Sequence, residues 1–571
     1  MKRDFNILRK NLKLDRSGMI PVRVAVLGDS ATQLFVQALV ATGVEQRISY
    51  DVFEADIGQM DLQVRDPESE FYAHQPEFVV LLPSAFHEHL RFCRMPPAER
   101  IHFAEQLTGR LEDLAAIITQ NTSAKVIIAN LPLLNDSVFG NYANKTEQSW
   151  IFQWRLINTG LMRLAAKQEN ILIADFDILR TQTGDAAFDS RLRISASMDF
   201  AVDFLPEAAG AVHGIIYAVR GAIKKCVVLD LDNTLWGGVI GDDGMEQIQI
   251  GDLGIGKAFS DLQRWMKQLK ERGIILAVCS KNTERIALEP FDKHPEMILR
   301  REDIAVFIAN WESKVDNIRH IQKVLNIGFD AMVFIDDNPA EREVVRQNIP
   351  GISVPELPDD PADYLTYLAS LNLFETASFS EEDAVRTKHY QEEAGRVGFQ
   401  KSFENEAEFL ASLSMKCTAK PFDAFSVPRL AQLSQRSNQF NLRTVRYTET
   451  DLQRIMNSDN YVTCSFSLSD KFGSYGLIGA VILEKKGDAL FIDTWIMSCR
   501  VLKRGMENFT MNKLVELARA KGFPAITGEY LPTPKNGIVA ELLNEMGFAG
   551  QQLLSLSVND YVPRPTMIAE G

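Results

Sequence analysis

The sequence predicts an α/β protein of three domains: a doubly wound parallel sheet first, a second parallel sheet in the middle, and an α+β domain last. Two observations predict this order. Short apolar runs alternate with helix-length segments through residues 20–350, which is typical of parallel sheets. After about residue 401, longer strands with alternating polarity precede two helical segments. A length of 571 residues with 46% hydrophobic content provides enough core for several domains.

Composition excludes several classes of protein. The formal net charge of −15 argues against nonspecific nucleic-acid binding, which needs a basic surface. No apolar run approaches the ~20 residues of a membrane span. Six cysteines are scattered without CxxC pairs, so we expect reduced thiols and neither a disulfide framework nor a zinc site. These features predict a cytoplasmic enzyme without nucleic-acid or membrane partners.

The first predicted domain covers residues 1–222. Its expected strands lie in VRVAVLGDS, ISYDVFEAD, EFVVLLP, AKVIIANLP and NILIADFDI. The first strand ends in Gly-Asp-Ser at residues 28–30, which resembles the nucleophile block of SGNH-type hydrolases. That resemblance would make Ser30 the nucleophile of an ester hydrolase. The plain alternative is a tight strand-to-helix turn capped by Asp29 or Ser30.

The other SGNH blocks match poorly. Gly58 fits the second block, but LLPSAF lacks the GxND of the third. His213 follows Gly210 by three residues, where the pattern wants an aspartate. An imidazole without that carboxylate loses the group that orients it. We therefore expect a domain that is degenerate as a hydrolase and serves recognition or assembly.

The second predicted domain, residues 223–355, carries the strongest functional signal. The apolar run CVVLDLDNT places Asp230 and Asp232 at the end of a strand. Strand alternation sends both carboxylates to one side, where they can reach one phosphate and one Mg²⁺. Because an acidic turn after a strand is commonly just solvated, further parts of a site must follow downstream.

Those further parts are present in order. The strand IILAVCS ends in Ser280, placed to hydrogen-bond a phosphoryl group, and Lys281 comes next. The helix SKVDNIRHIQKVL offers Lys314 as a point charge, a role that Lys281 could also fill. The strand AMVFIDDNP ends in Asp336 and Asp337, which would complete a metal site with Asp230 and Asp232.

The DxDNT pattern resembles the first motif of the haloacid dehalogenase (HAD) phosphatase superfamily. The resemblance implies that Asp230 attacks phosphorus to form an aspartyl phosphate. It also implies that Asp232 protonates the leaving oxygen and then activates water.

Residues 356–400 are predicted to form a helical connector, because GISVPELPDDP leads into the polar stretch SEEDAVRTKHYQEEAGR. Residues 401–571 form the last predicted domain. There, a strand hands over to a helix near Arg504 and Gly505, which resembles the acyl-CoA pyrophosphate loop of GNAT acetyltransferases. Glu507 occupies a position where that pattern has a small residue. The alternative ligand is therefore the phosphopantetheine arm of a carrier protein. An ordinary helix start is the plain reading.

The whole chain resembles FkbH-like proteins of HAD subfamily IIIC. The segments QLSQRSNQFNLRT, SDKFGSYGLIG, IDTWIMSCRVLKRG and EYLPTPKN carry this resemblance with the phosphatase motifs. It implies Mg²⁺-dependent processing of 1,3-bisphosphoglycerate or a related acid, whose acyl group passes through a cysteine thioester to an acyl carrier protein. The candidate residues for substrate or carrier binding are Lys281, Asn282, Asn338, Gln439, Asn441, Arg443, Cys499, Arg504, Gly505, Lys535 and Asn536.

Two cysteines compete for the thioester role. An acyl phosphate attacked at phosphorus would lose its activation, so Asp230 suits the monoester end and a thiolate suits the carbonyl. Cys279 directly precedes Ser280, although strand alternation turns the two apart; Cys499 stands beside Arg500. Two other hypotheses remain open: a plain HAD phosphatase of a sugar or acid phosphate with the last domain as a lid, and a non-catalytic assembly protein of a biosynthetic cluster.

Overall fold

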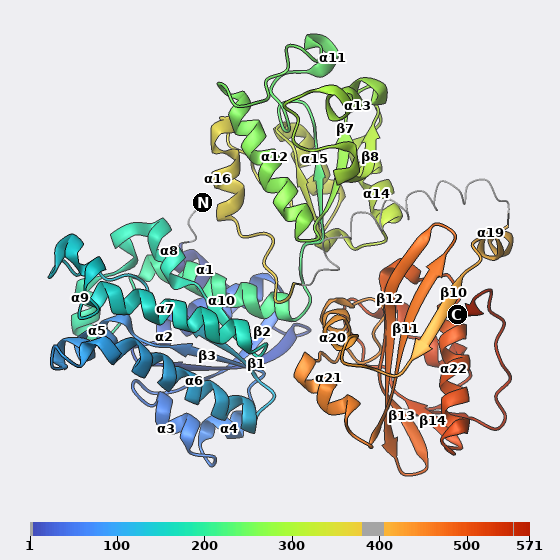
Figure 1. The fold of residues 1–571 in the computed structure, drawn as a ribbon, viewed down its shortest axis with the longest axis horizontal. Coiled ribbons are helices and arrows are strands. Elements are labelled where there is room, and N and C mark those ends of the chain that lie inside the picture. The colour runs from blue at the N-terminus through green and yellow to red at the C-terminus, as the bar shows by residue number, and fades with distance from the viewer. Residues whose placement is uncertain (1–3, 380–404, 552) are drawn as a thin grey trace. The chain divides into compact units, whose positions relative to one another are not determined.

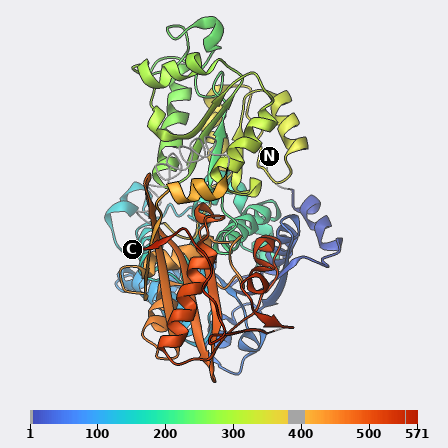
Figure 2. The same ribbon diagram turned by 90° about the vertical axis from the view of Figure 1, so that its right-hand side faces the viewer.

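The computed structural model describes residues 4–379, 405–551 and 553–571 (Figures 1 and 2). The chain divides into two compact units, Met1–Ala218 and Val219–Gly571. The described residues form three sheets, of which the first lies in the first unit and the other two lie in the second. The predicted α/β and α+β classes are confirmed. The polar stretch predicted as a connector helix, residues 380–396, lies outside the described residues.

The first unit contains a five-stranded parallel sheet of order β2-β1-β3-β4-β5. Side chains on both faces of the sheet are buried, and helices flank it (Figure 1). It is therefore doubly wound, as predicted. Its strands are β1 Ile20–Gly28, β2 Ile48–Glu54, β3 Phe78–Leu82, β4 Lys125–Ala129 and β5 Ile171–Ala174. The main helices are α2 Gln33–Glu45, α5 Ala85–Arg94, α6 Phe103–Asn121, α7 Trp150–Lys167, α8 Phe176–Thr183 and α10 Leu205–Val219.

The central sheet has four parallel strands in the order β8-β7-β6-β9. Each face is covered by its own apolar cluster, so the strands are buried on both sides, as continuous apolar runs such as CVVL predict. The strands are β6 Cys226–Leu229, β7 Ile275–Ser280, β8 Ile304–Ala309 and β9 Met332–Ile335. The helices are α11 Ile240–Asp243, α12 Gly256–Glu271, α13 Glu284–Lys293, α14 Lys314–Leu325, α15 Pro339–Asn348 and α16 Tyr364–Ser370.

The first part of the predicted connector belongs to this central domain. Tyr364 and Leu368 on α16, and Phe374 after it, lie in the same buried cluster as the strands β6 and β7. Their burial makes residues 364–374 part of the central domain. The surrounding segment is rich in proline and acidic residues, so the sequence did not indicate that these apolar side chains are buried.

The last sheet has eight strands in the order β15-β16-β14-β13-β12-β11-β10-β17. The long hairpin strands β11 to β13 match the predicted alternating runs. The strands are β10 Lys416–Lys420, β11 Tyr461–Asp470, β12 Gly473–Lys486, β13 Ala489–Met497, β14 Ala525–Gly528, β15 Ala549–Gly550, β16 Leu554–Ser557 and β17 Ala569–Glu570. The helices are α19 Glu406–Ser412, α20 Val427–Arg436, α21 Glu449–Met456, α22 Met506–Ala520 and α23 Leu542–Glu545. Within the described ranges, a search for a helix long and apolar enough to cross a membrane finds none.

Candidate active site

The central sheet brings three predicted aspartates together at its carboxyl edge. Asp230 directly follows β6, and Asp336 and Asp337 directly follow the neighbouring strand β9. The backbone N–H of Asp230 donates to Ile335 O at 3.0 Å, which fixes the two strand ends side by side. The carboxylate oxygens of the three aspartates lie within 4.8 Å of one another. Convergence at parallel strand ends is where α/β proteins place their sites.

These carboxylates fit a divalent cation. Burial raises the pKa of Asp336 to about 6, and the charge of Asp230 adds to the effect. The same two causes raise the pKa of Asp337. Three carboxylates that repel one another, two of them buried and one half-buried, are stabilised by a hard cation such as Mg²⁺, which prefers oxygen ligands.

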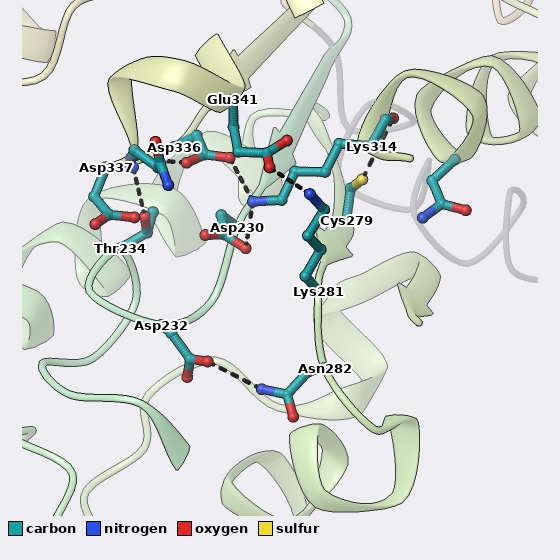
Figure 3. Close-up of polar contacts among 12 residues, drawn as sticks. Asp230, Asp232, Thr234, Cys279, Lys281, Asn282, Lys314, Asp336, Asp337 and Glu341 are labelled. Atoms are coloured by element: carbon teal, nitrogen blue, oxygen red, sulfur yellow. Dashed lines mark hydrogen bonds and ion pairs between the residues drawn. The ribbon is translucent and has the colours of Figure 1, made fainter. Parts of the chain in front are cut away.

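Lys314 is the cation that the structure places in this group. It begins α14, and its Nζ lies 2.5 Å from Asp336 Oδ2 and 3.1 Å from Asp230 Oδ1 (Figure 3). Burial alone would lower the pKa of Lys314, but the two carboxylates outweigh burial and raise it. Lys281, the alternative, instead pairs with Glu341 at 2.5 Å. Of the two lysines that could lie beside Asp230, it is therefore Lys314 that contacts it.

Asp232 occupies a different position from the one predicted for a metal ligand. Its Oδ1 accepts hydrogen bonds from Trp236 Nε1 at 2.9 Å and from Ile240 N at 3.1 Å. Its Oδ2 accepts one from Asn282 Nδ2 at 3.1 Å, and Figure 3 shows this pair apart from the other three aspartates. The group of side chains that could bind a metal is therefore three, not four. Burial raises the pKa of Asp232, which suits a general acid.

The remaining motif residues support this arrangement. Ser280 is the buried last residue of β7, at the same sheet edge as Asp230. Asn338, predicted to bind substrate, caps α15: its Oδ1 accepts a hydrogen bond from Ala340 N at 2.9 Å. Its side chain therefore has a structural partner.

Two further residues hold the aspartates in place, and the sequence analysis missed both. Thr234 Oγ1 accepts a hydrogen bond from Asp337 N at 3.1 Å. Arg342 donates to the backbone oxygens of Asp336 at 2.8 Å and Asp337 at 2.6 Å. Thr234 could have been found, because it is the last residue of the DxDNT motif. Nothing in the sequence near Arg342 indicated that its guanidinium contacts the aspartates.

Cys279 does not present its thiol to the site. Its side chain is fully buried, and its Sγ lies 3.8 Å from the backbone oxygen of Lys314. Burial raises the pKa of the Cys279 thiol to about 12, so the thiolate is disfavoured. Strand alternation, which turns Cys279 away from Ser280, accounts for this burial. The backbone of Cys499 lies in a short 3-10 helix, Cys499–Val501, but its side chain lies outside the described part.

The predicted binding residues of the last domain separate into two kinds. Asn441 and Asn536 are completely buried, and Asn536 Nδ2 donates to Asn441 O at 2.9 Å, which ties NQFNLRT to PTPKN. Arg443 pairs with Asp493 at 2.6 Å. These three side chains therefore organise the turns that carry them. Gln439 and Lys535, in contrast, line a cavity.

At the predicted acyl-CoA loop, Gly505 is the N-cap of α22. Its φ of +79° is readily available only to glycine. Arg504 is buried, with its guanidinium 5.6 Å from the ring centre of Tyr475. The predicted helix start is present, and its role in binding stays a prediction.

At the carboxyl edge of the first sheet, Ser30 lines a small cavity together with Asp199. His213 lies elsewhere, since its Nδ1 is 2.8 Å from the hydroxyl of Tyr50, and Tyr50 is opposite Val22 at the other end of β1. The described residues that line the cavity include no histidine. Val202 stands three residues after Asp199, where the DxxH spacing would place the imidazole.

Asp29 and Ser30 do not cap the following helix either. The N-cap of α2 is Thr32, and Asp29 pairs with Arg110 at 3.4 Å. The predicted capping role is therefore wrong, because the turn extends two residues further than expected.

Two comparisons with known proteins match parts of this chain closely. The family model described as FkbH, N-terminal domain, matches residues 23–217. A crystal structure of the N-terminal part of the protein BF1531 from Bacteroides fragilis, containing a phosphatase domain complexed with Mg, is 43% identical. The match covers 66% of this chain and 100% of that one, with a TM-score of 0.64.

Matches to acetyltransferases are far weaker. The ribosomal-protein-S18-alanine N-acetyltransferase of Escherichia coli is 13% identical, over 25% of this chain and 94% of that one, with a TM-score of 0.21. A mutant of spermidine N-acetyltransferase from Vibrio cholerae is also 13% identical, over 26% of this chain and 96% of that one, with the same TM-score. These values assign no activity to the last domain. A search of curated proteins found no match. On the strength of the Bacteroides fragilis match and the FkbH family model, this chain belongs to the FkbH-like family of HAD-type proteins.

Proposed function

We propose that this chain is a Mg²⁺-dependent phosphatase that uses Asp230 as its nucleophile and acts on the phosphate monoester of a short hydroxy acid. One observation carries the proposal: Asp230 is paired with Lys314 inside a three-carboxylate group, while Asp232 is held apart from it. A carboxylate beside an ammonium, near a carboxyl group with a raised pKa, forms the nucleophile and acid pair that monoester hydrolysis requires.

In the proposed reaction, a carboxylate oxygen of Asp230 attacks phosphorus and the bond from phosphorus to the leaving oxygen breaks. Asp232 gives its proton to that oxygen. Asp232 then takes a proton from the water that attacks the aspartyl phosphate, which releases inorganic phosphate and restores Asp230. Ser280 offers a hydroxyl to the phosphoryl oxygens, and Lys314 orients Asp230. Mg²⁺ held by Asp230, Asp336 and Asp337 would supply charge compensation to the phosphoryl group.

We further propose an acyl transfer by the same chain. In a substrate such as 1,3-bisphosphoglycerate, a thiolate attacks the carbonyl carbon of the acyl phosphate. The bond from that carbon to the bridging oxygen breaks, inorganic phosphate leaves, and the acyl group remains as a thioester. The thiol of an acyl carrier protein then takes the acyl group in a second thioester exchange. Membership in the FkbH-like family supports this step. We assign the thioester to Cys499 rather than Cys279, because the Cys279 thiol is enclosed and its pKa is raised.

The test is to incubate the chain with Mg²⁺ and freshly generated 1,3-bisphosphoglycerate and to measure phosphate release and intact protein mass. We expect phosphate release from the monoester end that EDTA abolishes, and a glyceryl adduct that hydroxylamine removes. The adduct should persist in Cys279→Ala and disappear in Cys499→Ala.

Other results would choose between the alternatives. Phosphate release without an adduct would contradict the acyl transfer and favour a phosphatase without acyltransferase activity. An adduct lost in Cys279→Ala would return the acyl role to that residue. No phosphate release from 1,3-bisphosphoglycerate, 3-phosphoglycerate or p-nitrophenyl phosphate with Mg²⁺ would overturn the phosphatase itself and favour an assembly role.

A further inference from the structure

A cavity of about 330 Å³ lies at the amino edge of the central sheet. Lys225, which lines it, directly precedes β6, and Asp330, which also lines it, lies just before β9. Asp230 and Asp336 follow the same two strands at the opposite edge. Five residues of extended chain separate Lys225 from Asp230, which corresponds to about 17 Å. The cavity is therefore a separate site from the phosphatase center.

The charge of the cavity wall is opposite to that of the chain. Its charged lining residues are one carboxylate, Asp330, and four cations, Lys225, Arg429, Arg500 and Lys535. The lining therefore has a net positive charge of three, whereas the chain has a net charge of −15. Asp330 is already held by Lys535 at 2.5 Å. Concentrated positive charge in an acidic protein favours an anionic ligand.

The walls of the cavity are joined by specific contacts. Asn438, which follows α20, donates from Nδ2 to Gly221 O at 2.8 Å. Gly221 has φ of +78°, and a Cβ there would lie 2.4 Å from Gln435 O, so only glycine permits this approach. Lys224 Nζ also donates to Asp330 O at 2.7 Å. Burial lowers the pKa of Lys224 to about 8; the charge of Asp330 opposes this shift and that of Lys535 adds to it.

We propose that this cavity binds the phosphate group of a small organic phosphate whose stem is uncharged. Arginine side chains bind phosphate through two parallel hydrogen bonds, and Arg429 and Arg500 provide two such groups. Ile327, Phe440 and Met497 also line the cavity and suit an uncharged stem. The volume is in the range of small-molecule sites.

The position of this site also bears on the acyl step. The backbone places Cys499 between Ser498 and Arg500, which both line the cavity. A ligand anchored by its phosphate would therefore lie beside residue 499. This second statement rests on the proposed acyl transfer, whereas the binding of phosphate does not.

The test measures binding of butyl phosphate to the full chain by equilibrium dialysis in EDTA, so that the Asp230 site has no cation. We expect saturable binding that n-butanol does not compete for. The double variant Arg429→Gln/Arg500→Gln should weaken binding by roughly 100-fold, about tenfold for each charge-assisted contact. The matched control is Lys521→Gln, which removes a cation of the same domain outside the cavity.

A second variant keeps the test decisive if the double variant does not fold. Gln432→Glu adds one negative charge to the cavity wall with no change in side-chain size, and should weaken binding roughly tenfold. Hydrolysis of p-nitrophenyl phosphate with Mg²⁺ should remain as in the unchanged chain in every variant, which separates this site from the phosphatase. Unchanged binding in Gln432→Glu, or no saturable binding at all, would overturn the proposal.

Competition then identifies the source of the phosphate. Displacement of butyl phosphate by pantetheine 4′-phosphate, but not by 3-phosphoglycerate, would identify a carrier arm. The reverse result would identify a free phosphorylated acid.

Discussion

Asp230 and Ser30 occupy equivalent places in two sheets, yet only one of them has the surroundings of a reactive group. Each follows an interior strand of a parallel sheet, β6 between β7 and β9, and β1 between β2 and β3. Around Asp230, the end of the neighbouring strand β9 supplies two more carboxylates, and the start of α14 supplies a lysine. Around Ser30, the described lining offers Asp199 and no imidazole. A polar residue at a strand end therefore becomes reactive only where other elements of the fold place suitable side chains beside it.

The charged groups near Ser30 also point elsewhere. Arg110 contacts Asp29 at 3.4 Å, Asp61 at 2.6 Å and Glu88 at 3.2 Å. Its guanidinium thus neutralises carboxylates and does not activate the hydroxyl. Lys314, in contrast, is directed at the proposed nucleophile itself.

The largest predicted effect tests this contrast directly. Asp230→Asn should lower kcat for p-nitrophenyl phosphate by roughly 10³-fold or more, because an amide cannot form the phosphoenzyme. Ser30→Ala should change kcat less than twofold. Phosphate release under steady-state conditions measures both, and circular dichroism checks that each variant is folded. A large loss in Ser30→Ala would break the comparison, as would full activity in Asp230→Asn.

The second prediction concerns Lys314, which pairs with Asp230. Lys314→Met should lower kcat by roughly 10²-fold, because the nucleophile loses its positioning charge. Without Mg²⁺ it should also lower the free energy of unfolding by about 3 kcal/mol, because Asp230 and Asp336 stay buried without their cation. Mg²⁺ should restore part of that loss, since it can replace the missing charge.

The control for this variant is Lys281→Met. It breaks an ion pair whose lysine is 43% exposed, so its effect on stability should be below about 1 kcal/mol. Thermal unfolding with and without Mg²⁺ measures both variants. Equal losses in the two lysine variants would show that Lys314 has no special place in the site.

The sequence predicted the order of the three sheets, the strands and the convergence of three aspartates because each depends on local pattern. Apolar runs fix β6, β7 and β9, and parallel pairing then brings Asp230, Asp336 and Asp337 together. Asp232 was misplaced because its partner Ile240 N lies at the start of α11, eight residues later, and strand alternation does not predict the position of that helix.

Long-range partners were the other limit of prediction. Asp199 reaches the cavity of Ser30 from more than 160 residues away, and no local pattern links the two positions. The cavity at the amino edge of the central sheet is likewise built from segments that are distant in the chain.

A third prediction sharpens the comparison through substrate choice. Lys281, directly after β7, and Glu341 on α15 lie beside the aspartates (Figure 3), and the lysine can exchange Glu341 for a carboxylate of the substrate. Lys281→Met should therefore reduce kcat/KM for 3-phosphoglycerate roughly tenfold relative to glycerol phosphate, which has no carboxylate. Glu341→Gln, which frees the lysine, should leave that ratio unchanged or raise it. Equal losses on both substrates in Lys281→Met would contradict this role.

The smallest predicted effect concerns stability at the unreactive site. Burial raises the pKa of Asp199 to about 6 from its ordinary 3.8, despite a hydrogen bond with Ser84 that lowers it. The folded chain therefore binds this proton more tightly than the unfolded chain. The contribution is fully present below about pH 4 and is lost as the pH rises through about 6. By this linkage, the first unit should lose about 2 to 3 kcal/mol of stability across that window.

Asp199→Asn removes the charge and keeps an acceptor for Ser84, so it should stabilise the first unit at pH 7.5 and flatten its stability between pH 4 and 6. Hydrogen exchange of β1 peptides in the full chain measures this, with the exposed Asp203→Asn as the matched control. An unchanged pH dependence would mean that Asp199 is solvated in solution. Asp336 has a pKa raised to a similar value for the same physical reason, but Lys314 and the proposed Mg²⁺ make its charge useful. A buried carboxylate thus lowers stability at the edge of the first sheet, where it is Asp199. At the edge of the central sheet, where it is Asp336, Lys314 compensates its charge and it can serve as a metal ligand.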